Sequence, residues 1–133
     1  MKLPGALTVG FALASEALWE LAAADLTLAL GNFAALRRRV RNERLRSCSD
    51  DAFVVERVCR AVRIACVWYY KPVLCLQRSA VTARMLKRRG IDAHMVVGAM
   101  RVPLRAHAWV CVQDRIVDER PDVVAKFAVL DVC

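Results

Sequence analysis

The apolar residues of this chain change their spacing at Gly90. Before Gly90 they recur every three or four residues, which is the spacing of one face of an α-helix. After Gly90, over residues 92–101, apolar side chains alternate with others, which is the period of a β-strand. Helices therefore come first and strands follow. This order predicts an α+β fold, with N-terminal helices followed by a small antiparallel sheet.

Breaks in the helical pattern divide the first part of the chain. Gly31-Asn32 interrupts it, Pro72 stops it again, and Gly90 is a natural residue to follow a helix end. Ser49 or Asp50 can cap the helix that follows the polar stretch before it. The predicted helices span residues 3–30 (as one or two helices), 33–46, 52–69 and 75–89.

The second part predicts three strands and a closing helix. Pro103 marks one turn, and Gln113-Asp114-Arg115 forms a tight connection after the second strand. The strands are expected over residues 92–101, 106–112 and 116–119, and the helix over residues 121–130, with Pro121 in its first turn.

The length of 133 residues suits one domain, which we expect to comprise an N-terminal helical segment (1–50) and a catalytic core (51–133). With 58% hydrophobic residues the chain is too apolar to be disordered. None of its six cysteines forms a CxxC pair or has zinc-ligand spacing, so no metal or cofactor is expected. Cysteines in apolar surroundings indicate free thiols. We therefore expect a reducing, cytoplasmic setting.

Lysine and arginine outnumber the acids by 21 to 13, and residues 37–46 carry a dense arginine run. Such a surface suits nucleic acid, anionic lipid or an acidic peptide. Aromatic residues are not interleaved with the arginines, so a solvated or partner-docking helix face is favoured over a nucleic-acid site. The leucine-rich segment before Gly31 is interrupted by Glu16, Glu20 and Asp25 and does not read as a membrane span. Packing is expected for it, with peripheral membrane contact as the alternative.

Cys75 opens a predicted helix shortly after Pro72. The N–H groups of a first helical turn and the helix dipole stabilise a thiolate. The same N–H groups can hold a developing oxyanion. Arg78, one turn further on, adds positive charge. A cysteine in this position is more often structural than catalytic, so a catalytic interpretation requires a base.

His107 is the candidate base. It lies in a predicted strand, in the run Arg105-Ala-His-Ala-Trp-Val, and its face of that strand also carries Trp109 and Cys111. A thiol at a helix N-terminus and an imidazole on a neighbouring strand supply a nucleophile and its base. The alternative for His107 is a packing residue in an apolar strand.

A carboxylate must then orient the imidazole, and two are available. With a two-residue turn, Asp118 would pair with Cys111 and share the face of His107. With a three-residue turn, Glu119 would lie on that face. The alternation of the strand leaves both open.

Several segments together resemble a known family. The matching stretches are Cys75-Leu-Gln-Arg-Ser, Leu86-Lys-Arg-Arg-Gly-Ile-Asp-Ala, Val97-Gly, His107-Ala-Trp-Val and Ile116-Val-Asp-Glu. In order and spacing they resemble the leader peptidase of lasso-peptide biosynthesis, the protease half of that family's B protein. It belongs to the transglutaminase-like (papain-like) cysteine protease superfamily. The resemblance covers roughly residues 70–128.

The resemblance implies a cysteine protease that cleaves the leader from a ribosomally made lasso-peptide precursor. An asparagine-synthetase-like cyclase would then close the macrolactam ring. The residues before Cys75 read as helical and do not resemble the strand-rich leader-recognition module, so a separate recognition protein is an expected partner. A gapless match to the family places the third catalytic residue at Glu119, where the family normally has aspartate. Another departure is Cys111, where a charged residue is more usual.

Trp109, Arg78 and Tyr70 are the candidate substrate-binding residues. His94 is expected to be a surface or packing residue. Two other functions stay open: a transglutaminase-like acyltransferase or amidase using the same thiol, and a non-enzymatic basic helical adaptor. The adaptor explains the arginine run but leaves the arrangement of Cys75 and His107 accidental.

Overall fold

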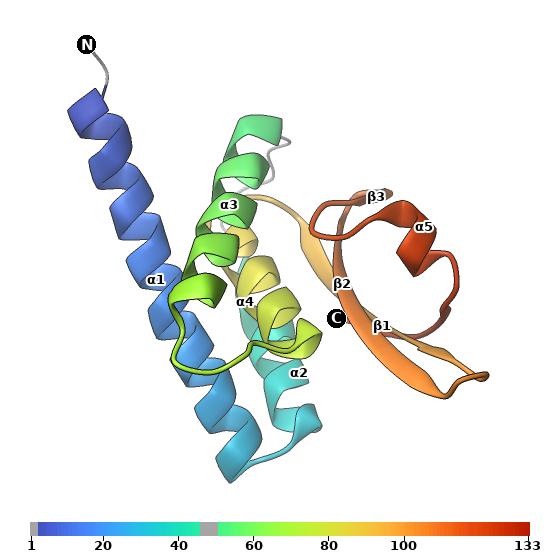
Figure 1. Cartoon of the computed structure of the whole chain (residues 1–133). Coiled ribbons are helices and arrows are strands. Elements are labelled where there is room, and N and C mark those ends of the chain that lie inside the picture. The colour runs from blue at the N-terminus through green and yellow to red at the C-terminus, as the bar shows by residue number, and fades with distance from the viewer. Residues whose placement is uncertain (1–2, 46–50) are drawn as a thin grey trace.

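The computed structural model describes residues 3–45 and 51–133, with side chains described from residue 10 onward. Helices come first and a sheet follows, so the predicted α+β fold is confirmed (Figure 1). The helices are α1 (Leu3–Leu30), α2 (Phe33–Asn42), α3 (Ala52–Trp68), α4 (Cys75–Arg88) and α5 (Pro121–Val124). The strands are β1 (Ala93–Met100), β2 (Arg105–Val112), β3 (Arg115–Ile116) and β4 (Ala128–Val132).

Helix α4 lies between the other long helices and the sheet (Figure 1). It packs against α1, α2 and α3 on one side and against β1 and β2 on the other. Its apolar stripe reaches the core at Met85 and Leu86, both fully buried. Leu21 of α1, Val58 of α3 and Val110 of β2 meet them in one continuous apolar cluster. The first residue of α4 is therefore held by a helix that is packed on both sides.

Side-chain caps set where helices begin. The side chain of Asn32 accepts a hydrogen bond from the N–H of Ala35 at 3.0 Å, as the break at Gly31-Asn32 predicted. The α3 cap is Asp51, which accepts from Phe53 at 3.0 Å. The predicted caps, Ser49 and Asp50, lie outside the described residues, and the prediction was wrong because Asp51 holds that position.

The ends of the predicted helices were less accurate than their starts. Gly90 has a φ of 82°, which a residue without a Cβ adopts freely, and it follows α4 as predicted. Helix α2 ends at Asn42, before the predicted residue 46, because Glu43 turns to an extended conformation with a ψ of 121°. The carboxylate of Glu43 then points to arginines of α4.

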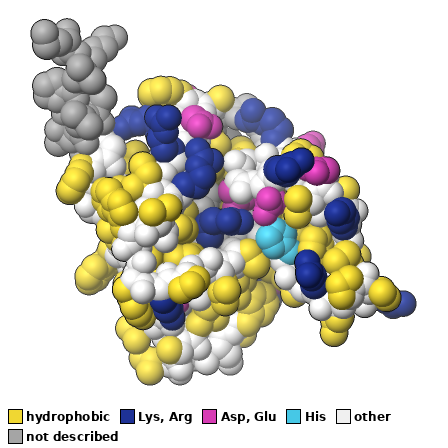
Figure 2. Space-filling view, viewed as in Figure 1, with side chains coloured by type: hydrophobic (Ala, Val, Ile, Leu, Met, Phe, Trp, Pro, Cys, Tyr) yellow, Lys and Arg dark blue, Asp and Glu magenta, His cyan; other side chains and the backbone are white. Residues whose placement is uncertain are grey.

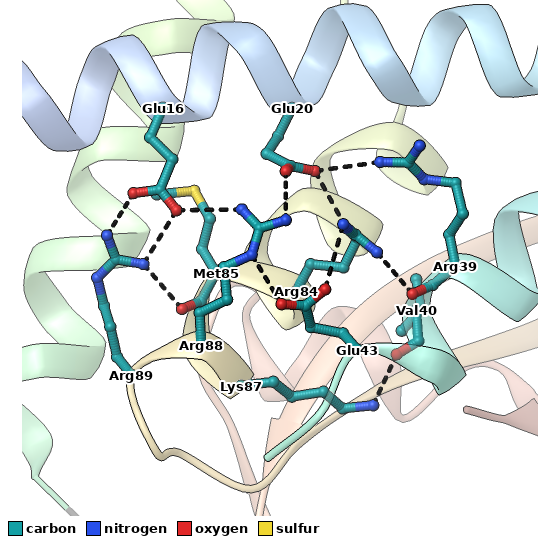
Figure 3. Close-up of polar contacts among 10 residues, drawn as sticks. All are labelled: Glu16, Glu20, Arg39, Val40, Glu43, Arg84, Met85, Lys87, Arg88 and Arg89. Carbon is teal, nitrogen blue, oxygen red and sulfur yellow. Dashed lines mark hydrogen bonds and ion pairs between the residues drawn. The ribbon is translucent and has the colours of Figure 1, made fainter. Parts of the chain in front are cut away.

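A network of ion pairs joins α1 and α2 to α4 (Figure 3). Arg88 lies at its centre, within 2.6 Å of Glu20 and 2.7 Å of Glu43. Arg84 contacts the same two carboxylates at 3.0 and 3.2 Å. Pairing with α4 explains why the acids of α1 that belong to this network, Glu16 and Glu20, interrupt an otherwise apolar helix. The remaining members of the network are Glu16, Arg39 and Arg89.

The arginines of the run that begins in α2 differ in solvent exposure. Arg37 and Arg39 are half-buried and pair with Asp131 and Glu20. Arg38, Arg41 and Arg44 are exposed. The prediction of a solvated face therefore holds for only part of the run.

The α1 helix packs along one side only. Leu21 is 1% exposed, whereas the side chains of Leu26 and Leu30 remain largely exposed. Within the described residues, no helix combines the length and apolarity needed to cross a membrane.

The four strands lie in the order β3-β2-β1-β4, and every neighbouring pair is antiparallel. The predicted third strand, 116–119, was too long, since β3 ends at Ile116. The N–H of Val117 still bonds to the carbonyl of Val110 at 3.1 Å. After Val117 the side chain of Asp118 accepts the N–H of Val110 at 2.8 Å. A carboxylate thus receives the hydrogen bond that a strand carbonyl would otherwise accept, and the chain leaves the ladder.

The predicted closing helix over residues 121–130 was also wrong beyond its first turn. Pro121 does occupy the first turn of α5, but α5 ends at Val124. Residues 128–132 form β4, which pairs with β1, and the N–H of Cys133 bonds to the carbonyl of Met95 at 2.8 Å. The sequence of a short apolar run is compatible with a helix or a strand. Here the run forms a strand, because it pairs with the open edge of β1.

Candidate active site

Cys75 is the first residue of α4, as the sequence predicted. The preceding residue, Leu74, has an extended conformation and makes no side-chain cap hydrogen bond. The N–H groups of the first three residues of α4 have no acceptor within the helix, and the side chain of Leu74 does not cap them. Together with the helix dipole they favour negative charge at this end of α4. The Cys75 side chain is half-buried.

His107 lies in β2 and contacts Glu119, which follows β3. Its Nε2 is 2.8 Å from Oε2 of Glu119, and both side chains are largely buried, at 18% and 19% exposed. An ionised carboxylate only accepts hydrogen bonds, so Nε2 is the donor. In a neutral imidazole this leaves the lone pair on Nδ1, which can accept a proton.

Several groups keep the Glu119 carboxylate ionised. Burial raises the pKa of Glu119, but hydrogen bonds from the Arg120 N–H and from His107 outweigh it, together with the charges of His107 and Arg78. The net effect is a pKa below the usual value for glutamate. Arg78 Nη2 lies 3.5 Å from the same Oε2 that contacts His107. Arg78 is one turn beyond Cys75, so it links the start of α4 to the carboxylate that holds the imidazole.

Asp118 makes different contacts from its neighbour. Oδ1 accepts the Val110 N–H at 2.8 Å, and Oδ2 accepts a hydrogen bond from the Ser79 hydroxyl at 3.4 Å. Burial raises the pKa of Asp118 above its usual value, against the lowering effect of the Val110 N–H and of the Arg78 charge. The pairing of Asp118 with Cys111, the alternative given for a two-residue turn, was wrong, because Cys111 pairs with Ile116. The chain leaves the sheet at Asp118, so strand alternation no longer decides where Glu119 points.

Aromatic rings support the imidazole. The ring centroid of Trp109 lies 6.1 Å from that of His107, and the centroid of Phe127 lies 5.4 Å from it. Trp109 was a candidate for substrate binding, but it is 2% exposed. Its position suits it to fixing the ring of His107, not to contacting a substrate.

The other candidate residues are dispersed. Tyr70 is 81% exposed, and its ring lies 4.9 Å from that of Tyr69. Arg78 contacts Glu119, as described above. His94 pairs with Asp92 at 3.2 Å on the surface, as expected of a residue outside the site. In Figure 2, basic, acidic and histidine side chains gather on the face shown.

Comparison with known proteins decides the family. The model of the transglutaminase-like superfamily matches residues 17–132, which include Cys75, His107 and Glu119. The chain belongs to the transglutaminase-like superfamily. It is also similar to the microcin J25-processing protein McjB of Escherichia coli, with 36% identity over 56 residues. That match covers 42% of this chain and 27% of McjB, so it spans about a quarter of the relative's length. No solved structure matches the chain.

The cysteines described in this transglutaminase-like chain are free thiols, and Cys48 lies outside the described residues. Burial is the main cause of a raised pKa at four of them, and it raises the pKa of Cys59 to about 11. A thiol with a raised pKa holds less thiolate at neutral pH and is a weaker nucleophile. The other three are Cys66, Cys111 and Cys133. No group of His, Cys, Asp or Glu among the described residues is arranged to hold a metal ion.

Two residues beside His107 were given no role in the sequence analysis, although one of them, Gly98, lies in the matched stretch Val97-Gly. Gly98 of β1 pairs with His107, and a Cβ built on it would lie 2.7 Å from Cη2 of Trp109 and 3.0 Å from Phe127. Phe127 was assigned to the closing helix. The sequence signal for Gly98 was a glycine in a strand predicted to pair with the strand that carries Trp109. The sequence gives no such signal for Phe127, because Phe127 comes close to His107 only when β4 pairs with β1.

Proposed function

We propose that this chain is a cysteine peptidase that removes the leader from a lasso-peptide precursor, with Cys75 as nucleophile, His107 as base and Glu119 as the residue that orients the base. The observation that carries the proposal is the 2.8 Å contact between Glu119 and His107, which lies on a strand against which α4 packs. Cys75 begins α4, and Arg78 of its first turn reaches Glu119.

The proposed reaction uses both nitrogens of His107. Glu119 accepts the Nε2–H, so Nδ1 is free to take the proton of the Cys75 thiol. The thiolate attacks the carbonyl carbon of the scissile peptide bond, and the first-turn N–H groups of α4 stabilise the oxyanion. The new amino terminus leaves with the proton from His107. Water, deprotonated by the same imidazole, then hydrolyses the thioester and frees the leader.

Neighbouring charges fit these roles. An ionised Glu119 stabilises the imidazolium that forms during each half of the reaction. Arg78 favours that ionised form. Asp118, whose pKa is raised, is bound to Val110 and Ser79, which suits it to holding the segment before Glu119 in place.

The substrate class rests on two likenesses. The sequence segments around Cys75, His107 and Glu119 resemble lasso-peptide leader peptidases, and McjB is named for processing microcin J25. On this basis the partners would be the precursor peptide, a separate leader-recognition protein and an asparagine-synthetase-like cyclase, in the cytoplasm. The recognition protein would raise the local concentration of precursor at the protease.

The test is incubation of the chain with the precursor encoded beside its gene, with and without the leader-recognition protein, followed by mass spectrometry. We expect a free leader ending in a carboxylic acid and a core peptide with a new amino terminus. Adding a primary amine separates peptidase from acyltransferase, because an acyltransferase would yield a leader amide instead of the acid. A precursor left uncleaved in the presence of the recognition protein would contradict the proposal.

A further inference from the structure

Asp25 of α1 contacts residues on both sides of Cys75. The Tyr69 hydroxyl donates to Oδ2 of Asp25 at 2.6 Å, and Nζ of Lys71 lies 3.0 Å from the same oxygen. The Gln77 amide donates to Oδ1 at 3.1 Å. Tyr69 and Lys71 precede Cys75, and Gln77 follows it by two residues. One carboxylate therefore holds the chain before and after the nucleophile.

This clamp matters because α4 lacks a cap of its own. Tyr69 ends α3, and a short loop leads to Leu74, which makes no side-chain cap hydrogen bond. The loop runs close to α1 (Figure 1). Gln77 lies in the first turn of α4, and its bond to Asp25 ties that turn to α1. The start of α4 is thus positioned by a residue some fifty positions earlier in the chain.

The clamp is buried and charged. The Asp25 side chain is 13% exposed, and Gln77 is 8% exposed. Burial raises the pKa of Asp25, but hydrogen bonds from Tyr69, Lys71 and Gln77 and the charge of Lys71 outweigh it and lower the pKa. Hydrogen bonds to an ionised acceptor are shorter and stronger than neutral ones. Both oxygens of the carboxylate are used, so its orientation is fixed.

We propose that Asp25 is a positioning residue for Cys75, which sets the first turn of α4 relative to His107 by holding Tyr69, Lys71 and Gln77. The inference rests on the proposed function, since it assigns Cys75 as the reacting thiol. It adds α1 to the elements that build the active site. Asp25 touches neither substrate nor the reacting atoms in this account.

The test compares Asp25→Asn with wild type in two assays. The first measures kcat and KM for precursor cleavage. The second measures the rate of Cys75 alkylation by iodoacetamide across pH, with the modified peptide identified by mass spectrometry. Asp131→Asn is the matched control, because Asp131 also forms a half-buried pair with an N-terminal arginine, Arg37. Tyr69→Phe removes a single hydroxyl and is the milder second variant.

We expect Asp25→Asn to lower kcat by about tenfold or more with KM little changed, because small displacements of a reacting group are costly. The rate of Cys75 alkylation at each pH should fall, since the thiol loses its placement against the N–H groups of the helix terminus. Tyr69→Phe should shift both readouts in the same direction by less. Asp131→Asn should leave both near wild type.

Two results would overturn the inference. One is an Asp25→Asn variant with the kcat and alkylation profile of wild type. The other is an equal change in Asp131→Asn, which would indicate a general loss of stability. Should wild type fail to cleave any precursor, the proposed function would fall, and the alkylation profile would still decide the role of Asp25.

Discussion

Glu119 holds the Nε2 of His107 at 2.8 Å, although it lies beyond the end of β3. Asp118, the residue before it, takes the backbone N–H of Val110 and so ends the strand. Two adjacent carboxylates therefore have different tasks. One leads the chain out of the sheet, and the other meets the imidazole.

The two carboxylates are separated by Glu119→Gln and Asp118→Asn, which change little volume. Glu119→Gln should lower kcat by about a thousandfold or more, because an amide neither selects the tautomer nor stabilises the imidazolium. Asp118→Asn should cost stability more than catalysis, since its contacts are to Val110 and Ser79. Steady-state kinetics and thermal unfolding of both variants measure this. Full activity in Glu119→Gln would mean that Cys75 and His107 act as a dyad.

His107 and His94 are the two histidines of the chain, and they form a natural pair of test and control. His107→Ala should lower kcat by roughly three orders of magnitude or more, because the thiol loses its base. His94→Ala should retain near-normal kcat, since His94 pairs with Asp92 at the surface. Comparable losses in the two variants would refute the assignment of the base.

The spacing of apolar residues was enough to predict most elements of the fold. Helical periodicity before Gly90 and alternation after it gave α1, α3, α4, β1 and β2 within a few residues. The errors lie where residues distant in the sequence determine the secondary structure. Residues 128–132 became β4 because the edge of β1 was open, and β3 was cut short by the Asp118 side chain.

In the candidate site, too, local sequence patterns predicted some features, whereas others depend on residues distant in the sequence. Cys75 was recognisable from its place at a helix start, and the matched spacing of the family favoured Glu119 over Asp118. Strand alternation pointed to Asp118 across a two-residue turn and to Glu119 across a three-residue turn. Neither argument applies, because both assume a continuous strand and β3 ends at Ile116. The role proposed for Asp25 could not be predicted, because α2 and α3 separate Asp25 from its three partners along the chain.

The contacts of Gly98 predict a strong effect of side-chain size at that position. Gly98→Val should lower stability by about 1–3 kcal/mol and also reduce kcat, because the new side chain must displace Trp109 or Phe127 beside His107. Gly10→Val is the control, since a Cβ at Gly10 meets nothing within 4 Å. Chemical denaturation and cleavage rates would be compared. A Gly98→Val variant as stable and active as Gly10→Val would contradict this packing.

The ion-pair network between α1 and α4 predicts sensitivity to acid. The pKa values of Glu16 and Glu20 lie below 4.5 in the folded chain, since hydrogen bonds and charges of Arg84, Arg88 and Arg89 outweigh the raising effect of burial. Their stabilisation is complete above the unfolded pKa and is lost as pH falls through the lower folded values. The free energy of unfolding should therefore decrease as the pH is lowered below about 4.5.

Glu20→Gln should remove much of this dependence and cost about 3 kcal/mol near neutral pH, because Glu20 is buried and its loss leaves Arg84 and Arg88 with only part of their counter-charge. Glu56→Gln is the control, as Glu56 pairs with Arg63 at an exposed site and should cost under about 1 kcal/mol. Denaturant unfolding at several pH values measures both. Equal costs for the two variants would show that the network adds no more than a surface pair.

The most direct test of the account replaces the nucleophile. Cys75→Ala and Cys111→Ala would be compared for precursor cleavage by mass spectrometry, because Cys111 is a second thiol on the same strand as His107. The account predicts no cleavage by Cys75→Ala, with an unchanged circular dichroism spectrum, and near-normal cleavage by Cys111→Ala. Turnover retained in Cys75→Ala, or lost only in Cys111→Ala, would contradict the assignment of Cys75 as the catalytic thiol.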